Sequence, residues 1–404
     1  MWDMVVTSIL IRPFAVQPRR KPATIADRLI PTPSRGGRDA AIDVSGRFET
    51  ERRKEFDNGR AREEPAERLA AGVTFERPKR VITRNNSPNI AFDRSIDPYR
   101  GCEHGCFYCF ARPNHVHLGL PAGLDLESRL IAIEGAAELL ERELASASYW
   151  PATVAFGVNA DPYQPIERQY RITRSLLATL QRARHPLSIV TKSNLILRDL
   201  DILSAMGRER LVKVFVSVAT LDQQVARRME PRAPTPQKRL EAIEVLNDAG
   251  VPAGVVVAPI IPAINDAEIE TILTRAYSAG AREASYAVLR LPHELRDVFR
   301  ERLLAHYPAK LRRAISLIQS MDDDTDGDRP MSGSGAYDWM VKRRFETAAR
   351  RLGYRETPAT LRADLFRKPA PAANEARAHL IAGARHTEPR GWQGRLPDRI
   401  LGQR

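Results

Sequence analysis

The three cysteines of this 404-residue chain, Cys102, Cys106 and Cys109, all lie in the segment RGCEHGCFYC. Their spacing, C-x3-C-x2-C, brings three soft thiolate ligands around one metal centre. Three thiolates can hold three irons of a 4Fe-4S cluster and leave the fourth iron open to a cofactor or substrate. Because an odd number of cysteines without distant partners does not build a disulfide framework, the segment also indicates a reducing compartment, and we expect a cytoplasmic protein.

The same cysteines are also compatible with a structural zinc ion that takes His104, His115 or His117 as its fourth ligand. In this alternative the chain is a zinc-stabilised, non-enzymatic protein that binds nucleic acid through its basic ends. The cysteines follow a predicted strand and do not lie in a small isolated zinc module, which favours the iron-sulfur cluster. Three unligated core cysteines are disfavoured, because Glu103, His104 and Gly105 between them are poor core residues.

Repeated apolar runs alternate with amphipathic helical segments from Asn89 onward. We expect buried strands near 92–99 and at 153–158, 187–190, 211–218, 253–260 and 284–291. We expect helices at 126–146, 168–184, 236–250 and 266–280, of which the last two end at the capping residues Gly250 and Gly280. This alternation predicts an α/β fold with a parallel sheet, and six strand-helix units fit a partial (β/α)6 barrel.

Polar residues follow several of the expected strands at the point where each strand ends. Asn159 and Asp161 follow the second strand, Lys192 follows the third, and Ser217 ends the fourth. In parallel architectures the chemistry lies at the carboxyl ends of the strands, where the cysteine segment also lies. The sequence therefore predicts one pocket that contains these side chains and the cysteines.

The segment GCEHGCFYC resembles the CxxxCxΦC signature of the radical S-adenosylmethionine (radical SAM) superfamily. The likeness extends in order over SIDPYRGCEHGCFYCFARP, NADPYQPIE, VTKSNLILRDLDIL and MEPRAPTPQKRLEAIEVLNDAG, which are similar to blocks of the spore photoproduct lyase-like (DNA repair photolyase-like) group. The segment ARPNHVHLGLPAGLD resembles an uncharacterised bacterial branch of that group. The resemblance implies a 4Fe-4S cluster that reductively cleaves S-adenosylmethionine to a 5′-deoxyadenosyl radical, which acts on a substrate such as a nucleic-acid lesion or modified nucleotide.

The resemblance also implies roles for individual residues. Tyr108 would lie near the adenine of the cofactor, and Asn159 and Asp161 would replace the superfamily's GGE motif at the cofactor's amino group. Lys192 would pair with the cofactor's carboxylate, and Ser217 would face the ribose or that carboxylate. Arg232, in EPRAP, can donate two parallel hydrogen bonds to a carboxylate. No catalytic side chain is assigned.

The family's implied partner is a one-electron reductant of the flavodoxin or ferredoxin type. Spore photoproduct lyase is understood to use an additional cysteine as hydrogen-atom donor, and this chain has no fourth cysteine. The donor must then be another group such as Tyr163 or Tyr286, a solvent-derived hydrogen, or the cofactor itself.

The net charge of +13 is concentrated at the two ends of the chain, because residues 1–80 and 366–404 each carry +5. We expect residues 1–85 to be a basic, largely disordered extension, 86–300 the radical SAM core, 301–365 a helical region and 366–404 a basic flexible tail. Basic ends permit nucleic-acid binding without proving it. No apolar run approaches the roughly 18 residues that a membrane span requires, so we expect no membrane partner. The oligomeric state is not predicted.

Overall fold

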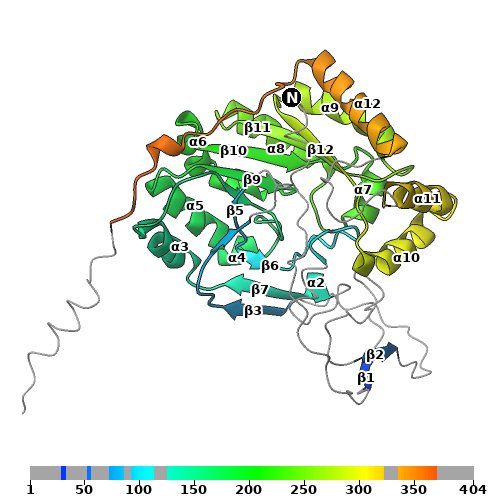
Figure 1. Cartoon of the computed structure of the whole chain (residues 1–404), viewed down its shortest axis with the longest axis horizontal. Coiled ribbons are helices and arrows are strands. Elements are labelled where there is room, and N and C mark those ends of the chain that lie inside the picture. Colours follow the sequence, from blue (N-terminus) through cyan, green and yellow to red (C-terminus); the bar gives the residue numbers. More distant parts are fainter. Residues whose placement is uncertain are drawn as a thin grey trace, which may run out of the picture.

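The computed structural model describes residues 29–32, 52–55, 72–85, 92–112, 125–322 and 335–370 (Figure 1). Its centre is a seven-stranded sheet in the order β12-β11-β10-β9-β8-β5-β4. All neighbouring strands in it are parallel except β4 and β5. The strands are β4 (Ile82–Arg84), β5 (Arg94–Ile96), β8 (Val154–Phe156), β9 (Leu187–Thr191), β10 (Val212–Ser217), β11 (Ala253–Ile260) and β12 (Ala284–Val288). The six expected strands are confirmed, and they are the six parallel ones.

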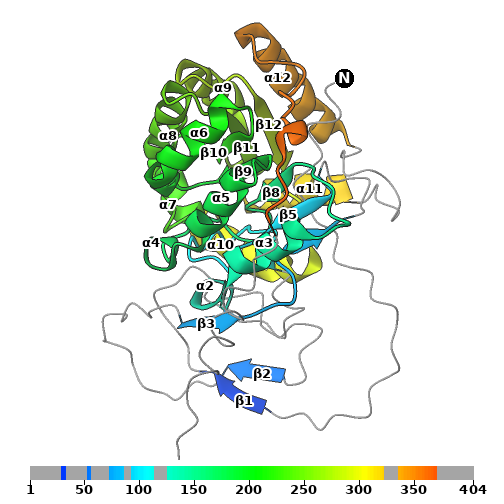
Figure 2. The ribbon, with the colours of Figure 1, turned by 90° about the vertical axis from the view of Figure 1, so that its left-hand side faces the viewer.

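Helices connect successive parallel strands and cover the outer face of the sheet. They are α3 (Ala136–Ala145), α4 (Glu167–Tyr170), α5 (Ile172–Arg182), α6 (Leu200–Arg208), α7 (Gln223–Met229), α8 (Pro236–Asp248) and α9 (Ile269–Ser278). Figure 2 shows α5, α6, α8 and α9 stacked beside the strands. Gly250 (φ 77°) and Gly280 (φ 93°) adopt the left-handed conformation just beyond α8 and α9, as the sequence predicts. The fold is therefore the α/β type with a parallel sheet that the sequence predicts, with β4 and β12 as the sheet edges among the described residues.

The expected helix over 126–146 is wrong in its first half. After the short helix α2 (Asp125–Ser128), residues Arg129–Ile133 form strand β7, which pairs with β3 (Gly72–Glu76) and β6 (Tyr99–Arg100) in a second, three-stranded sheet. Leu130 and Ala132, two residues apart, are fully buried, which is the period of a strand. The expected helix over 168–184 is also interrupted, because Arg171 has a φ of 53° between α4 and α5.

The region after the sheet contains α10 (Arg296–His306), α11 (Leu311–Asp322) and α12 (Ala336–Leu352). On α10, the ring of Phe299 packs against Phe107 of the cysteine loop, with centroids 5.5 Å apart. On α12, Arg344 forms an ion pair with Glu270 of α9 at 2.6 Å. The helical additions therefore lie on both sides of the β12 edge (Figure 1).

Residues 355–368, here called the strap, cross the amino ends of the parallel strands. Their backbone N–H groups donate to carbonyls that precede β12, β10 and β9: Arg355 to Arg282 at 2.9 Å, Arg362 to Arg210 at 2.9 Å, and Arg367 to Ala183 at 2.8 Å. Beyond the short 3-10 turn η5 (Ala363–Leu365), the aromatic ring of Phe366 packs on His185 with centroids 5.4 Å apart. The strap thus binds the end of the sheet opposite to the cysteine loop.

Within the expected extension, β3 and β4 are integral strands of the two sheets, and β1 (Leu29–Thr32) pairs in parallel with β2 (Arg52–Glu55). The parts 1–28, 33–51 and 56–71 of that extension, the segment 113–124 and the tail beyond Ala370 lie outside the described residues. No helix in the described ranges is long and apolar enough to cross a membrane.

Candidate functional site

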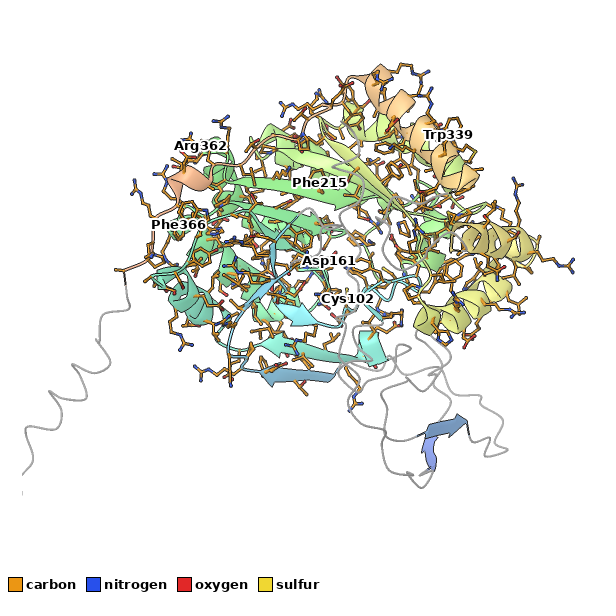
Figure 3. All side chains as sticks on the ribbon, viewed as in Figure 1. Cys102, Asp161, Phe215, Trp339, Arg362 and Phe366 are labelled. Atoms are coloured by element: carbon orange, nitrogen blue, oxygen red, sulfur yellow. The ribbon has the colours of Figure 1, made fainter. Side chains whose placement is uncertain are left out.

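The cysteine loop follows β6 and is fixed by backbone hydrogen bonds. The N–H of Cys102 donates to Leu126 O at 2.9 Å, and the N–H of Cys109 donates to Cys106 O at 3.2 Å. Cys102 and Cys106 are buried, whereas Cys109 is half-buried. All three line one cavity at the carboxyl ends of the strands. Figure 3 labels Cys102 and Asp161, two of the residues that line it. The same cavity is lined by Tyr108, Asn159, Asp161, Lys192 and Ser217, so the structure brings together eight of the nine predicted site residues.

Burial controls the state of the thiols. It raises the pKa of the Cys102 thiol to about 12 and that of Cys106 well above its usual value. The backbone N–H groups of Asp161 and His104 favour the Cys102 thiolate but do not offset burial. A buried thiol of this kind becomes a thiolate when a metal centre replaces its proton. Three thiols around one space, with polar groups beside them, fit a three-cysteine cluster that keeps one iron open.

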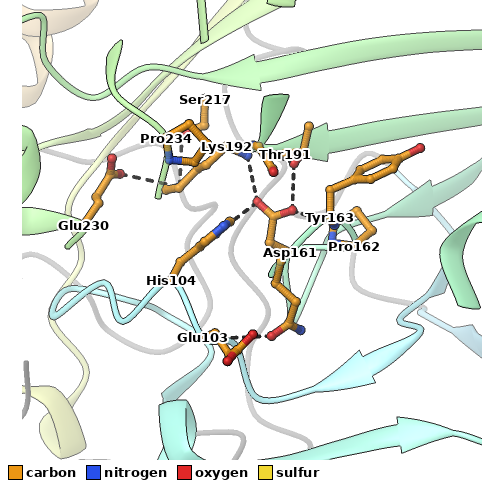
Figure 4. A network of polar contacts seen from close by, with 12 residues as sticks. Glu103, His104, Asp161, Pro162, Tyr163, Thr191, Lys192, Ser217, Glu230 and Pro234 are labelled. Carbon is orange, nitrogen blue, oxygen red and sulfur yellow. Dashed lines mark hydrogen bonds and ion pairs between the residues drawn. The ribbon is translucent and has the colours of Figure 1, made fainter. Parts of the chain in front are cut away.

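Asp161 joins three segments of the site, as Figure 4 shows. One carboxylate oxygen accepts the hydroxyl of Thr191 at 2.7 Å and the N–H of Tyr163 at 2.9 Å. The other accepts the N–H of Lys192 at 2.7 Å and lies 3.4 Å from Nδ1 of the buried His104. The carboxylate therefore ties the end of β8 to the end of β9 and to the cysteine loop. Its assignment as a ligand of the cofactor's amino group stays a prediction.

Lys192 and Ser217 lie together on the wall of the cavity. Lys192 Nζ donates to Ser217 Oγ at 3.1 Å, and Ser217 in turn donates to Ala258 O at 3.0 Å. Lys192 Nζ is also 3.9 Å from Glu230 Oε1. Burial is the largest single influence on the pKa of Lys192 and lowers it, but the negative charges of Glu230, Cys106 and Asp161 together outweigh burial and raise the pKa. The ammonium is therefore charged at neutral pH and a fifth exposed, with a side-chain exposure of 20%.

Glu230 links the lysine to an aromatic side chain of the cysteine loop. It accepts the hydroxyl of Tyr108 and forms a buried ion pair with Arg239. Burial would raise the pKa of Glu230, but Arg239 and Lys192 lower it below its usual value. Arg239 also donates to Ser217 O at 3.0 Å. Glu230 and Arg239 are missing from the predicted site, although Glu230 lies in the motif MEPRAP.

Arg232 lies against the outside of the loop and does not line the cavity. Its guanidinium donates to the carbonyl of Glu103 and to the buried Glu127, which also pairs with the buried Arg112 at 3.4 Å. Arg112 donates to Cys106 O at 3.0 Å. Arg232, which was predicted as a cofactor-binding residue able to donate to a carboxylate, is thus engaged with the loop that carries the cysteines.

Asn159 is oriented by Asp97, a carboxylate directly after β5. Asp97 accepts the side-chain amide of Asn159 at 2.7 Å and its backbone N–H at 2.8 Å. Burial raises the pKa of Asp97 despite these hydrogen bonds. Asp97 was not predicted, although its position at the end of the first strand is a signal that could have identified it. Neither Tyr163 nor Tyr286 lines the cavity, and the ring of Tyr286 packs on Phe345 at 4.5 Å.

The zinc alternative needs a histidine beside the thiols. His104 is buried and faces Asp161, while His115 and His117 lie outside the described residues. No three His, Cys, Asp or Glu side chains in the described part of the chain are arranged around a single metal ion.

Comparison with known proteins decides the family. The uncharacterized protein Rv2578c of Mycobacterium tuberculosis is 34% identical over 247 residues, which are 60% of this chain and 73% of the relative. The model of the radical SAM superfamily matches residues 96–276, from the end of β5 into α9. The chain belongs to the radical SAM superfamily. It is therefore an enzyme of that superfamily, and the zinc-stabilised binding protein is not supported.

Two further comparisons are more distant. The uncharacterized protein MJ0683 of Methanocaldococcus jannaschii is 28% identical over 178 residues, 43% of this chain and 62% of that protein. The solved structure of a spore photoproduct lyase mutant is also similar. The match covers 75% of this chain and 87% of the lyase chain, at 17% identity and a TM-score of 0.48.

Proposed function

We propose that this radical SAM enzyme holds a 4Fe-4S cluster on Cys102, Cys106 and Cys109 and binds S-adenosylmethionine in the adjoining cavity. When bound, the cluster and S-adenosylmethionine supply a 5′-deoxyadenosyl radical that abstracts hydrogen from a substrate. The observation that carries the proposal is the shared cavity, because the family's thiols, a charged lysine and two polar side chains line it together.

The chain's own residues have separate tasks in this proposal. Lys192, with its ammonium charged and fixed by Ser217, holds the carboxylate of the cofactor by a charge-assisted hydrogen bond. Asn159, oriented by Asp97, offers its side-chain oxygen to an amino group. Glu230 fixes Tyr108, whose ring lies in the wall beside the cluster ligands. Asp161 and Arg232 position the loop and the strand ends.

The reductant, the substrate and the compartment remain predictions. A one-electron donor of the flavodoxin or ferredoxin type would reduce the cluster, in the cytoplasm. A nucleic-acid substrate, for repair or modification, rests on the family likeness and on the basic ends of the chain, which lie mostly outside the described residues.

The test is anaerobic reconstitution with iron and sulfide, then dithionite reduction with S-adenosylmethionine and chromatography for 5′-deoxyadenosine. We expect about four irons per chain and 5′-deoxyadenosine formation that Cys106→Ala abolishes. Ser316→Ala, at an exposed serine of α11, is the control and keeps both. One tightly bound zinc and no 5′-deoxyadenosine would contradict the proposal.

A further inference from the structure

The interior of the partial barrel is lined in layers, because alternate residues of each parallel strand point inward. The layer at the carboxyl ends holds the site residues Lys192, directly after β9, and Ser217 of β10. Two residues earlier along the same strands are Val190 and Phe215. Two earlier again are Ser188 and Lys213, and the inward residues Ala155 of β8 and Ser285 of β12 line the same deep end.

This deep end is hollow. Ala155, Ser188 and Ser285 are small, whereas closed barrels of this class fill their interior with bulky branched side chains. The two large residues, Lys213 and Phe215, do not fill this space. Lys213 pairs with Glu283 at 3.4 Å. The ring of Phe215 packs against Gly254, where an added Cβ on the glycine would lie 2.9 Å from the ring. A cavity of about 670 Å³ results, with residues 356–361 of the strap as one wall.

The hollow adjoins the functional site. Gly157, Val158, Val190 and Val256 line both the deep cavity and the cavity that contains the cysteines. Four residues of strand separate Lys192 from Ser188, which corresponds to about 13 Å along the barrel axis. A molecule of that length can therefore touch the deep end and present its other end to the site.

The lining shows which chemistry the cavity accepts. Its charged side chains are paired: Lys213 with Glu283, Asp93 with Arg94 at 2.6 Å, and Glu356 with Arg350 at 3.6 Å. The hydroxyls of Ser188 and Ser285 have no protein hydrogen-bond partner among the described residues. Burying an unpaired charge beside these groups would be costly, whereas a hydroxyl or amide would find partners.

We infer that the deep cavity binds an elongated, uncharged small molecule, largely hydrocarbon, with a hydroxyl or amide group that hydrogen-bonds Ser188 or Ser285. Binding in the deep cavity does not depend on the proposed function. The inference rests on that function only where it places the other end of the molecule at the site of the radical chemistry. A polyanion such as nucleic acid does not suit this lining, because the cations in it are already paired.

The test measures binding and needs no reduction of the cluster, so it fails or succeeds independently of 5′-deoxyadenosine formation. The reconstituted full-length protein is titrated with the neutral fluorophore N-phenyl-1-naphthylamine, and competitors then displace it. We expect 1-octanol to compete at least about ten-fold better than octanoate, which has the same chain length but a charge. Replacing both serines with alanine should weaken 1-octanol about two- to ten-fold and leave the fluorophore unchanged.

Two different variants that fill the cavity are used, so that the test still works if one of them does not fold. Ser285→Leu enters the hollow from β12 and Ala155→Leu from β8, and either should weaken the fluorophore at least about ten-fold. Ser316→Leu, on the exposed face of α11, is the matched control and should bind like the unmodified protein. Unchanged binding in a folded filling variant overturns the inference. Displacement by a single-stranded DNA oligonucleotide as effective as by 1-octanol overturns it as well.

Discussion

Arg232, just beyond α7, donates a hydrogen bond from its guanidinium to the carbonyl oxygen of Glu103, between the first and second cysteines. The N–H of Arg232 also donates to the carbonyl of His104 at 3.3 Å. The segment after β10 therefore holds the cysteine loop in place from outside. This contact requires a residue without a side chain in the loop, which gives the first prediction.

Gly105→Ala should prevent stable cluster binding. Gly105 has a φ of 69°, and an added Cβ would lie 2.2 Å from Arg232 Nη2 and 2.7 Å from Glu127 Oε2. Gly250→Ala is a matched control, because its φ of 77° is similar but no atom lies within 4 Å of its added Cβ. We expect Gly250→Ala to cost only the left-handed strain of about 1–2 kcal/mol and to retain iron. Iron content after reconstitution and gel filtration distinguishes them, and equal iron in both variants would contradict the prediction.

Asp161→Asn should loosen the site almost as much as Asp161→Ala. Both carboxylate oxygens of Asp161 accept hydrogen bonds, whereas an amide has only one accepting oxygen. The NH2 group of the asparagine would therefore face either the N–H of Lys192 or the donors at Tyr163 and Thr191. We expect a loss of about 1–3 kcal/mol in the free energy of unfolding, measured by urea denaturation. Asp248→Asn, at the exposed last residue of α8, should be neutral. An Asn variant as stable as the original chain would show that Asp161 does not tie the strand ends together.

Glu230→Gln should destabilise the protein by about 3–5 kcal/mol, because it leaves the buried guanidinium of Arg239 without its anion. It should also weaken binding of S-adenosylmethionine, since Tyr108 and Lys192 lose a common partner. Denaturation and equilibrium dialysis measure the two effects. Glu244→Gln, on the exposed face of α8, is the control. The prediction fails if the two variants behave alike.

Stability should rise with pH between about pH 4 and pH 6.5, partly through His185. Burial lowers the pKa of His185 from 6.5 to about 4 in the folded chain, where the Tyr149 hydroxyl lies 2.7 Å from its Nε2. Below pH 6.5 the unfolded chain binds a proton that the folded chain does not, so acid favours unfolding; above pH 6.5 the contribution is constant. The full shift corresponds to about 3 kcal/mol.

His185→Gln tests this, because its amide can still bond Tyr149 and the Pro186 carbonyl. The variant should lose less free energy of unfolding between pH 7 and pH 5 than the original chain, as measured by denaturation at both values. His293→Gln, at an exposed histidine, controls for the substitution itself. An unchanged pH dependence in His185→Gln would assign the acid sensitivity elsewhere.

The sequence predicted most of the parallel strands because they read as apolar runs that are largely buried, as in Ala253–Ile260. It did not predict β7, because RLIAI continues directly into the amphipathic residues of α3. The pairing with β6 and with β3, the latter more than fifty residues earlier in the chain, distinguishes a strand from a helical turn there.

The cysteines and the strand-end residues were predicted because their types are scarce and their positions recur at one end of the sheet. The carboxylates that position them were not. Glu230 contacts Tyr108 across 122 residues of sequence, and Asp97 contacts Asn159 across 62. No local pattern marks such a partner, since a carboxylate in a loop looks the same whether it faces water or a buried guanidinium. Arg232 is the opposite case. It lies in a family motif and was predicted to bind the cofactor, but it contacts the cysteine loop and does not line the cavity.

The strap has a consequence for the order in which the protein is completed during translation. Its carbonyl partners at Ala183, Arg210 and Arg282 are synthesised long before residues 355–368 leave the ribosome. The amino ends of β9, β10 and β12 therefore stay hydrated while the strands between them assemble, and the deep cavity gains its last wall only after nearly the whole chain has emerged. A nascent or prematurely terminated chain thus has a complete cysteine loop above an unfinished barrel.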